Sequence, residues 1–226
     1  MDELENPERH WSQTGEVADI TAEAIERRLG TPYDPSEYEL LGGGLANTTV
    51  RVGTDRVLRI YRRDVDSLGK EASLLNRPWS HLRTPDVLTV GEDFLLMEHV
   101  PHSALRASSE HAAALGRAVA EIHATDFETG GFLSPDARDV ARPFDDVWDA
   151  LVAHVKSHEN VPEDIVAEVV AFLESHARQL RAACEAPSLL HGDFKVSNLH
   201  WTSEGMPLVL DWEFAWAGPP LMDIGQ

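Results

Sequence analysis

The chain has 226 residues, of which 42% are apolar, and this is enough for one large or two small domains with a real core. The formal charge is −20 at pH 7, and no stretch forms the basic face that contacts to nucleic-acid phosphates require. DNA and RNA are therefore excluded as partners. The acidity fits either the attraction of a cationic substrate or adaptation to high salt, and the composition leaves both open.

No targeting or membrane segment is expected. The amino terminus is acidic where a signal peptide is basic and then apolar, and no apolar run approaches the roughly 18 residues of a membrane span. We therefore expect a cytoplasmic protein without a membrane partner. The single cysteine, Cys184, lies in a helical pattern, so we expect it to be buried as a small apolar residue.

The first hundred residues predict a helix followed by a sheet. Apolar or small residues recur at helical spacing over residues 16–29, and Gly30 ends that helix. A second helix is predicted from Asp66 or Ser67 to Leu75. Five strands of an antiparallel sheet are predicted at residues 38–41, 50–52, 56–61, 87–90 and 94–97.

Between the first two strands lie three glycines, followed by Asn47, Thr48 and Thr49. Glycines let a backbone approach phosphates closely and permit positive φ, and the polar side chains add hydrogen-bond donors. An ordinary hairpin turn explains the same residues, because the segment matches neither common glycine-rich phosphate motif.

Charged residues in this half also allow two interpretations. By period-2 alternation, Arg59 lies on the same face as Val57 and Tyr61, which suits the wall of a cleft as well as an exposed position. Glu71 lies in the predicted second helix beside Lys70, where a solvated glutamate is the simpler interpretation.

From Ser108 onward the pattern predicts helices. Their apolar positions are Leu115, Val119 and Ile122 in the first, Phe144, Val147, Trp148, Leu151 and Val155 in the second, and Ile165, Val169, Phe172 and Leu180 in the third. His123 ends the first helix, and we expect it to pack. His154 and His158 have the spacing of zinc ligands, but without a third ligand nearby a solvated face is favoured.

Residues 191–198 contain the strongest candidates for catalytic and metal-binding side chains in the chain. Asp193 and Asn198 lie five positions apart between short apolar runs, and a further run, 207–210, ends at Asp211. This predicts a tight loop between two strands. Transfer of a γ-phosphate to a hydroxyl needs one carboxylate at the acceptor's proton and oxygen ligands for Mg²⁺. Alternatively, Asp193 and Asn198 form a turn and Asp211 caps a strand.

The order His-x-Asp-x-x-x-x-Asn, followed by an Asp that opens a short motif, is the protein-kinase signature. Here Gly192 replaces the arginine that follows the histidine, and Asp211-Trp212-Glu213 replaces Asp-Phe-Gly. With both differences the chain resembles the aminoglycoside phosphotransferase family, which are small-molecule kinases sharing the protein-kinase core. The resemblance covers about residues 36 to 224.

The resemblance implies an α+β, protein-kinase-like, two-lobed fold. Its amino-terminal lobe is an antiparallel five-stranded sheet plus a helix, and its carboxy-terminal lobe is mainly helical. We therefore expect an amino-terminal helical extension at residues 1–36, a nucleotide-binding lobe at 37–97, a hinge at 98–101 and a catalytic lobe at 102–226. The family's final helices, which wall the acceptor site, are expected to be missing.

The resemblance also implies roles for individual residues. Asp193 is expected to be the catalytic base, Lys195 to reach the γ-phosphate, and Asn198 and Asp211 to hold Mg²⁺. Arg59 occupies the place of the kinase lysine that grips the phosphates, and Glu71 is expected to form an ion pair with it. The nucleotide-binding residues implied are Gly43, Gly44, Asn47, Thr48, Arg59, Glu71, Met97, Glu98 and Val100, with adenine pairing to the backbone of the last two.

The implied function is transfer of the γ-phosphate of ATP or GTP to a hydroxyl of a small molecule, aminoglycoside-like or other. The fourteen residues between Asp211 and Gln226 contain no Ser, Thr or Tyr and no Ala-Pro-Glu, which favours a small acceptor over a regulated protein kinase. Asp223 resembles a family Asp that braces the catalytic loop. A nucleotide-binding pseudokinase and a non-catalytic interaction module remain alternatives.

Overall fold

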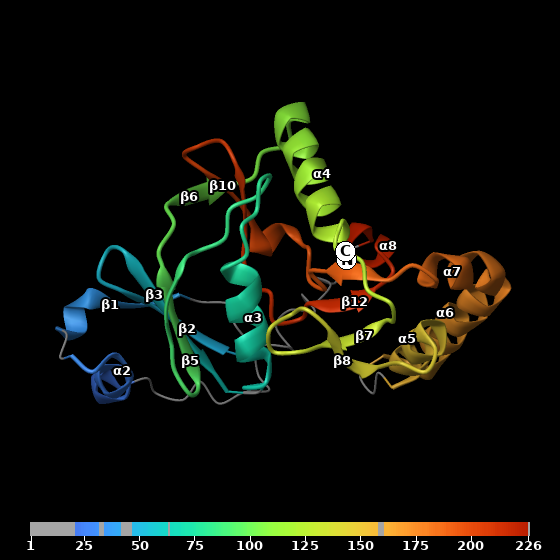
Figure 1. Ribbon diagram of the computed structural model, residues 1–226, viewed down its shortest axis with the longest axis horizontal. Coiled ribbons are helices and arrows are strands. Elements are labelled where there is room, and N and C mark those ends of the chain that lie inside the picture. The colour runs from blue at the N-terminus through green and yellow to red at the C-terminus, as the bar shows by residue number, and fades with distance from the viewer. Residues whose placement is uncertain (1–20, 32–33, 42–46, 63, 158–160, 226) are drawn as a thin grey trace, which may run out of the picture. The chain divides into compact units, whose positions relative to one another are not determined.

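The computed structural model describes residues 21–31, 34–41, 47–62, 64–157 and 161–225, which belong to two compact units (Figure 1). The first, here called the N-terminal unit, comprises Met1–Leu68 and Pro85–Pro101. The second, the C-terminal unit, comprises Gly69–Thr84 and His102–Gln226.

The N-terminal unit is built on one antiparallel sheet with the strand order β1-β2-β3-β5-β4. Its strands are β1 (Tyr38–Leu41), β2 (Asn47–Val52), β3 (Arg56–Tyr61), β4 (Val87–Val90) and β5 (Phe94–Glu98). The predicted five-stranded antiparallel sheet is therefore confirmed. β2 begins earlier than predicted because Asn47 and Thr48 pair with Tyr61 and Ile60 of β3.

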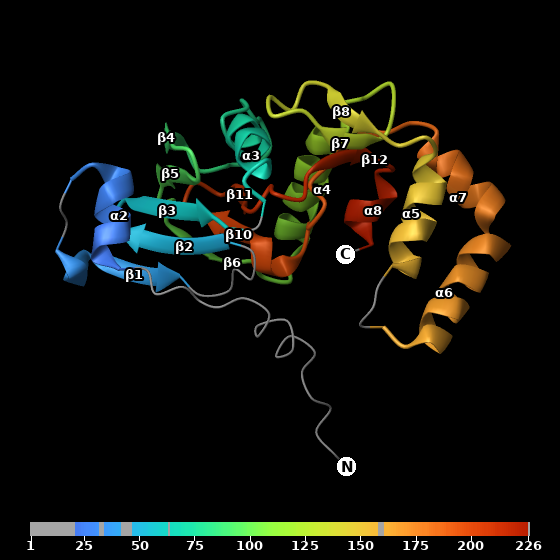
Figure 2. The same ribbon diagram turned by 90° about the horizontal axis from the view of Figure 1, so that it is seen from below.

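Helix α2 (Ala22–Leu29) supplies the apolar cover of this sheet (Figure 2). Thr21 caps its first turn, and Gly30 ends it in the left-handed conformation with φ 69°. The buried cluster beneath it comprises Ile25, Val50, Val52, Leu58, Ile60, Phe94 and Leu96. The amino-terminal part of the predicted helix, residues 16–20, lies outside the described residues.

An ion pair fastens α2 to the turn between β4 and β5. Arg28 donates through Nε to Oδ1 of Asp93 at 3.0 Å and through a second nitrogen to Oδ2. These bonds to Arg28 hold the pKa of the Asp93 carboxyl below its ordinary value. A short 3₁₀ turn, η1 (Pro35–Glu37), leads from the helix region into β1.

The helices of the C-terminal half are α4 (Ser109–His123), α5 (Val147–Lys156), α6 (Glu163–Ser175), α7 (Ala177–Cys184) and α8 (Leu221–Ile224). Prediction of one helix through Ile165 and Leu180 was wrong, because the backbone of His176, with φ −111° and ψ 11°, separates α6 from α7. Cys184 is half-buried, and burial raises the pKa of its thiol. In the described part of the chain, no helix is long and apolar enough to cross a membrane.

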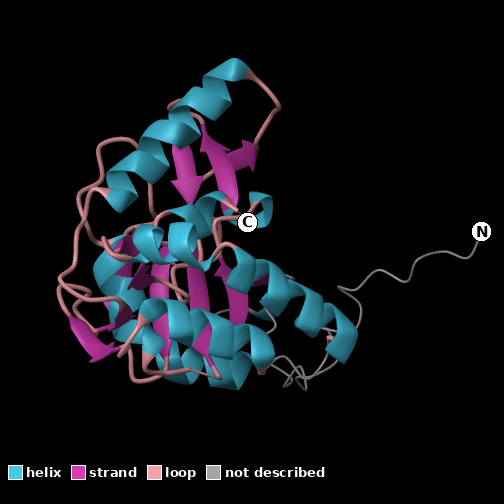
Figure 3. Cartoon of the chain, turned by 90° about the vertical axis from the view of Figure 1, so that its right-hand side faces the viewer, coloured by secondary structure: helices cyan, strands magenta, loops and turns pink. Residues whose placement is uncertain are grey.

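Two small sheets complete the C-terminal unit. The strands expected on either side of residues 191–198 are present, whereas most of the other strands after Ser108 were not predicted. One sheet has the order β11-β10-β6 and lies beside α4 (Figure 3). The other sheet has the order β8-β7-β12-β9. The strands are β6 (His102–Ala104), β7 (Gly131–Leu133), β8 (Val140–Pro143), β9 (Ser188–Leu190), β10 (Leu199–Thr202), β11 (Pro207–Val209) and β12 (Trp216–Gly218).

Four of these strands, β6, β7, β8 and β12, escaped prediction because of their short length and their distant partners. Each has three or four residues, too few to show a period-2 pattern. Most of their partners are also distant in sequence: Ala217 pairs with Gly131 on one side and with Leu189 on the other. Such pairing depends on tertiary contacts that no local pattern records.

Helix α3 (Ser67–Leu75) has the predicted extent, but its charged residues are not solvated. Glu71 is 1% exposed and Lys70 is 8% exposed. Burial of two ionisable side chains is costly unless each finds a partner. Their partners lie in the segment that follows Asp211.

The core of the N-terminal unit provides a first test. Leu58 of β3 is fully buried, whereas Leu88 of β4 is 52% exposed. We expect Leu58→Ala to lower the free energy of unfolding by about 2–5 kcal/mol, because it leaves a cavity in the cluster under α2. Leu88→Ala, the matched control, should cost much less. Urea unfolding measures both, and equal losses would contradict the placement of Leu58.

Candidate active site

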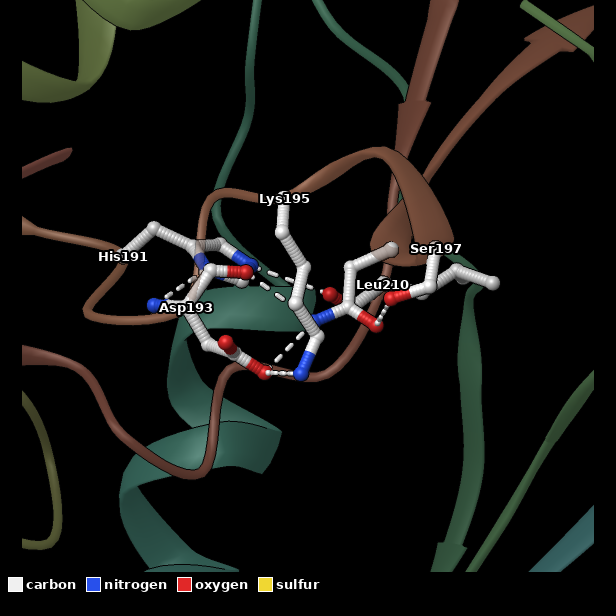
Figure 4. Close-up of polar contacts among 6 residues, drawn as sticks. His191, Asp193, Lys195, Ser197 and Leu210 are labelled. Carbon is white, nitrogen blue, oxygen red and sulfur yellow. Dashed lines mark hydrogen bonds and ion pairs between the residues drawn. The ribbon is translucent and has the colours of Figure 1, made fainter. Parts of the chain in front are cut away.

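The loop of residues 191–198 joins β9 to β10, as the sequence predicts. β9 is buried along its whole length, so the loop begins from a fixed point in the core. Its last residues form the 3₁₀ turn η2 (Val196–Asn198), in which the amide of Asn198 donates to the carbonyl of Lys195 at 2.9 Å. Figure 4 shows the polar contacts of this loop.

Asp193 and Asn198 are joined directly. The Asn198 side-chain amide donates to the Asp193 backbone carbonyl at 3.0 Å and to Asp193 Oδ2 at 2.9 Å. Lys195 Nζ lies 2.9 Å from the same Oδ2, and the Lys195 side chain is 54% exposed. Because both contacts fix one carboxylate oxygen, they set the orientation of the Asp193 side chain (Figure 4).

His191 links this loop to the strand that precedes Asp211. Its ring is fully buried, and burial lowers the pKa of the imidazole below its ordinary value of 6.5. The neutral ring donates through Nε2 to the Leu210 carbonyl at 2.9 Å and accepts the Asp193 amide at Nδ1 at 3.2 Å. One imidazole thus connects the residue before Asp211 with the backbone of Asp193.

Asp223 braces the loop from α8, and the sequence prediction of this brace is confirmed. Its side chain is fully buried, Oδ2 accepts the His191 amide at 2.8 Å, and Oδ1 accepts the Gly192 amide at 2.9 Å. His123 Nε2 lies 3.0 Å from Oδ2. The expectation that His123 only packs was therefore wrong, because the end of α4 meets this buried carboxylate.

Gly192 stands where the backbone requires a glycine. Its φ is +81°, and a Cβ at this position would lie 2.2 Å from the carbonyl oxygen of Phe214. A larger residue would strain the backbone and displace the segment after Asp211. The close approach therefore explains why the residue after His191 is glycine.

Asp211 follows β11 and is placed beside the loop by a backbone bond. The Leu210 amide donates to the Asn198 carbonyl at 3.0 Å, which brings the residue before Asp211 against Asn198. Asp211 itself has a left-handed backbone with φ 67°, which is unusual for a residue other than glycine. The structure thus places an amide and a carboxylate side chain on neighbouring backbones.

This donor set is of the kind that Mg²⁺ accepts. Mg²⁺ prefers oxygen ligands and is commonly held by one or two protein groups together with phosphates and water. Both hydrogen bonds donated by the Asn198 side chain go to Asp193, and its Oδ1 accepts the Ser197 hydroxyl at 3.5 Å. Within the described ranges, no cluster of three or more His, Cys, Asp or Glu side chains offers a metal site made of protein ligands alone.

Two side chains of helix α3 contact the segment after Asp211, and the sequence did not predict these contacts. Glu71 Oε1 accepts the Trp212 amide at 3.3 Å, and Lys70 Nζ donates to the carbonyls of Glu213 and Ala215 at 2.7 and 2.8 Å. Trp212 is fully buried, and its ring stacks on that of Trp79, with centroids 5.3 Å apart. The only sequence signal was the pair of adjacent charges in an otherwise uncharged helix.

The remaining predicted nucleotide residues belong to the N-terminal unit. Asn47 and Thr48 are buried on β2, Met97 is buried on β5, Val100 is buried just after it, and Glu98 ends β5. Arg59 is 9% exposed, with its guanidinium 5.5 Å from the ring centre of Tyr61, as their shared face predicts.

Several of the sequence predictions stay predictions. Gly43 and Gly44 lie outside the described residues, as does His158; His154 is exposed. Arg59 and Glu71 belong to different units, so their ion pair stays a prediction.

Comparison with known proteins identifies the family. The model of a family described as "Phosphotransferase enzyme family" matches residues 37–226. The chain belongs to this family. Among curated proteins, none matches it in sequence.

Solved structures of phosphotransferases share the fold. The macrolide 2'-phosphotransferase MphH from Brachybacterium faecium is 22% identical with a TM-score of 0.60, covering 90% of this chain and 74% of that one. The aminoglycoside phosphotransferase APH(4)-Ia is 21% identical with a TM-score of 0.64, covering 90% and 75%. A thermostable mutant of APH(4)-Ia, in a ternary complex with AMP-PNP and hygromycin B, is 21% identical with a TM-score of 0.66, covering 90% and 74%.

The kinase-like α+β fold and the enzyme class are thus as the sequence predicts. By the family match, the protein is a phosphotransferase. The resemblance drawn from residues 191–213 is confirmed by the family match, which spans both units.

The brace formed by Asp223 is testable. In Asp223→Asn, one carboxylate oxygen is replaced by an NH₂ group that must face a backbone amide hydrogen, so at least one buried donor loses its acceptor. We expect the free energy of unfolding to fall by about 1–3 kcal/mol. Asp145→Asn, at an exposed position, is the matched control and should leave the urea midpoint unchanged. Equal stability of the two variants would refute the brace.

Proposed function

We propose that this phosphotransferase moves the γ-phosphate of a Mg²⁺-bound nucleoside triphosphate, ATP or GTP, to a hydroxyl of a cationic, aminoglycoside-like small molecule. The observation that carries the proposal is the linkage of three groups. Asp193 is bonded to Asn198, and Asn198 is bonded through its backbone to the residue before Asp211. A base and two oxygen ligands therefore share one rigid arrangement in the C-terminal unit.

Asp193 is proposed to orient the acceptor hydroxyl and to take its proton late in the transfer. In a loose transition state the hydroxyl becomes acidic only as the new bond forms, so the position of the carboxylate matters more than its basicity. The bonds from Asn198 and Lys195 to Oδ2 hold the carboxylate in one orientation. A fixed carboxylate loses little freedom when the acceptor binds.

Lys195 is proposed to contact the γ-phosphate. Its side chain is half-exposed and is paired with Asp193, so its ammonium is free to shift toward a stronger negative charge nearby. A contact that strengthens while charge develops on the transferring group lowers the barrier. The same shift would release Oδ2 of Asp193 for the acceptor.

Asn198 and Asp211 are proposed to hold Mg²⁺. A Mg²⁺ ion held by these two residues would supply positive charge that offsets the negative charge developing on the phosphates during transfer. The chain's own contribution is the placement of two oxygen donors whose backbones are tied together by the Leu210–Asn198 bond. A prearranged pair of ligands needs no rearrangement when the metal nucleotide arrives.

The nucleotide contacts proposed from the family resemblance lie in the N-terminal unit, apart from Glu71. They are the glycines 43 and 44, Asn47, Thr48, Arg59, Met97, Glu98 and Val100. Arg59 is always charged and can bind phosphate oxygens through two nitrogens. The division into a nucleotide-binding lobe at 37–97, a hinge at 98–101 and a catalytic lobe at 102–226 belongs to this proposal, as does a cytoplasmic location.

A cationic acceptor is supported by the charge of the chain. A formal charge of −20 raises the local concentration of positively charged ligands. The related APH(4)-Ia mutant was solved with hygromycin B. A panel of aminoglycosides, macrolides, amino alcohols and neutral sugars, assayed for phosphate transfer, tests the class; transfer to neutral sugars alone would contradict the cationic acceptor.

Nucleotide binding provides the next test. We expect ATP or GTP to raise the melting temperature only weakly without Mg²⁺, because Asn198 and Asp211 would otherwise face the phosphates without a cation. With Mg²⁺ and nucleotide at about 100 times Kd, stabilisation should reach roughly 2.7 kcal/mol. Thermal-shift assays with and without Mg²⁺ measure this, and no shift with any Mg²⁺-nucleotide would sink the proposal.

The roles of the two aspartates are separable. Asp193→Asn should leave the melting temperature and the Mg²⁺-nucleotide affinity nearly unchanged while turnover of the acceptor falls by at least about 100-fold. Asp211→Asn should instead weaken Mg²⁺ binding, because it removes a ligand. Asp145→Asn is the exposed control and should match the parent. Full activity of Asp193→Asn on a true acceptor would show that this residue only holds the turn.

A further inference from the structure

The backbone around Asp211 is held from three sides by side chains of the C-terminal unit. His191 donates to the carbonyl of residue 210, Glu71 accepts the amide of residue 212, and Lys70 donates to the carbonyls of residues 213 and 215. Two of these side chains are neighbours on α3. We call residues 210–215 the Asp211 segment.

Such fastening has a physical reason in the conformation of Asp211. A left-handed backbone in a residue other than glycine is strained, and it persists only where the surroundings impose it. Glu71 acts directly after Asp211 and His191 directly before it. Lys70 fixes the chain two and four residues further on, which prevents the segment from rotating as a whole.

A buried lysine at position 70 would lower the stability of the fold if its side chain only filled space. It is 8% exposed, and a buried ammonium loses most of its hydration. An apolar side chain of similar length would fill the same volume without that cost. The ammonium instead makes two short, charge-assisted bonds of 2.7 and 2.8 Å to backbone carbonyls that an apolar residue would leave without this donor.

We propose that Lys70 is a positioning residue for the metal site: by bonding to the carbonyls of Glu213 and Ala215, it keeps Asp211 in its left-handed conformation and so sets the affinity for Mg²⁺. The inference rests on the proposed role of Asp211 as a Mg²⁺ ligand. Lys70 touches neither nucleotide nor acceptor in this role. It acts through the segment, as hydrogen-bonding partners outside a metal's ligands commonly do.

The test measures Mg²⁺ affinity rather than turnover. Parent protein and variants are held at saturating AMP-PNP, and MgCl₂ is titrated while the melting temperature is followed. We expect Lys70→Met to raise the Mg²⁺ concentration at half-maximal stabilisation by about tenfold. Lys70→Arg, which keeps charge and donors, should stay within about twofold of the parent, because a guanidinium can still reach the two carbonyls.

Two controls separate positioning from loss of stability. Lys156→Met removes an exposed lysine in α5 and should leave the Mg²⁺ midpoint unchanged. Leu133→Ala removes a buried side chain from β7 and should lower the melting temperature without moving the Mg²⁺ midpoint. If Lys70→Met does not fold, Lys70→Gln, which keeps one donor group, should still raise the midpoint by at least about threefold.

The outcomes are distinguishable from those of the proposed function. If the parent shows no Mg²⁺-dependent stabilisation, the proposed function itself fails. If the parent responds normally and Lys70→Met or Lys70→Gln has the parent's midpoint, the inference about Lys70 is overturned while the proposed function stands. A midpoint raised equally in Leu133→Ala would also overturn it, because the effect would then follow stability alone.

Discussion

The buried carboxylate of Asp223 is the constraint on which the site depends. Two consecutive amides of the loop, those of His191 and Gly192, donate to its two oxygens, and His123 meets it from α4. A fully buried carboxylate with these partners is expensive to disturb, because any displacement leaves charge or donors without partners. The start of the loop is therefore fixed before Asp193 is reached.

From this fixed point, backbone and side-chain bonds fix the positions of Asp193 and of the backbone next to Asp211. The neutral ring of His191 donates a hydrogen bond to the Leu210 carbonyl, and the side-chain amide of Asn198 donates one to Asp193 Oδ2. Phosphoryl transfer needs little covalent chemistry from the protein and much positioning. The polar network can supply this positioning, because each contact holds an oxygen atom in place and does not need to change its reactivity.

Helix α3 contributes to this arrangement through its two adjacent charged residues, Lys70 and Glu71. Glu71, whose ion pair with Arg59 stays a prediction, accepts the Trp212 amide, and Lys70 donates to the carbonyls of Glu213 and Ala215. The left-handed Asp211 lies between these contacts and the His191 bond. Strain at Asp211, the proposed Mg²⁺ ligand, is thus maintained by the side chains of His191, Lys70 and Glu71.

The sequence by itself determined the local features: the strands of the N-terminal sheet, the ends of α3, and the loop whose Asp193 and Asn198 lie five residues apart. Local periodicity and motif spacing are sufficient for these. Only the tertiary structure decided the short strands β6, β7, β8 and β12, the break at His176, the bond of His123 to Asp223, and the burial of Lys70. These depend on partners up to about 145 residues away, and a local pattern holds no information about which distant carbonyl or carboxylate a side chain will meet.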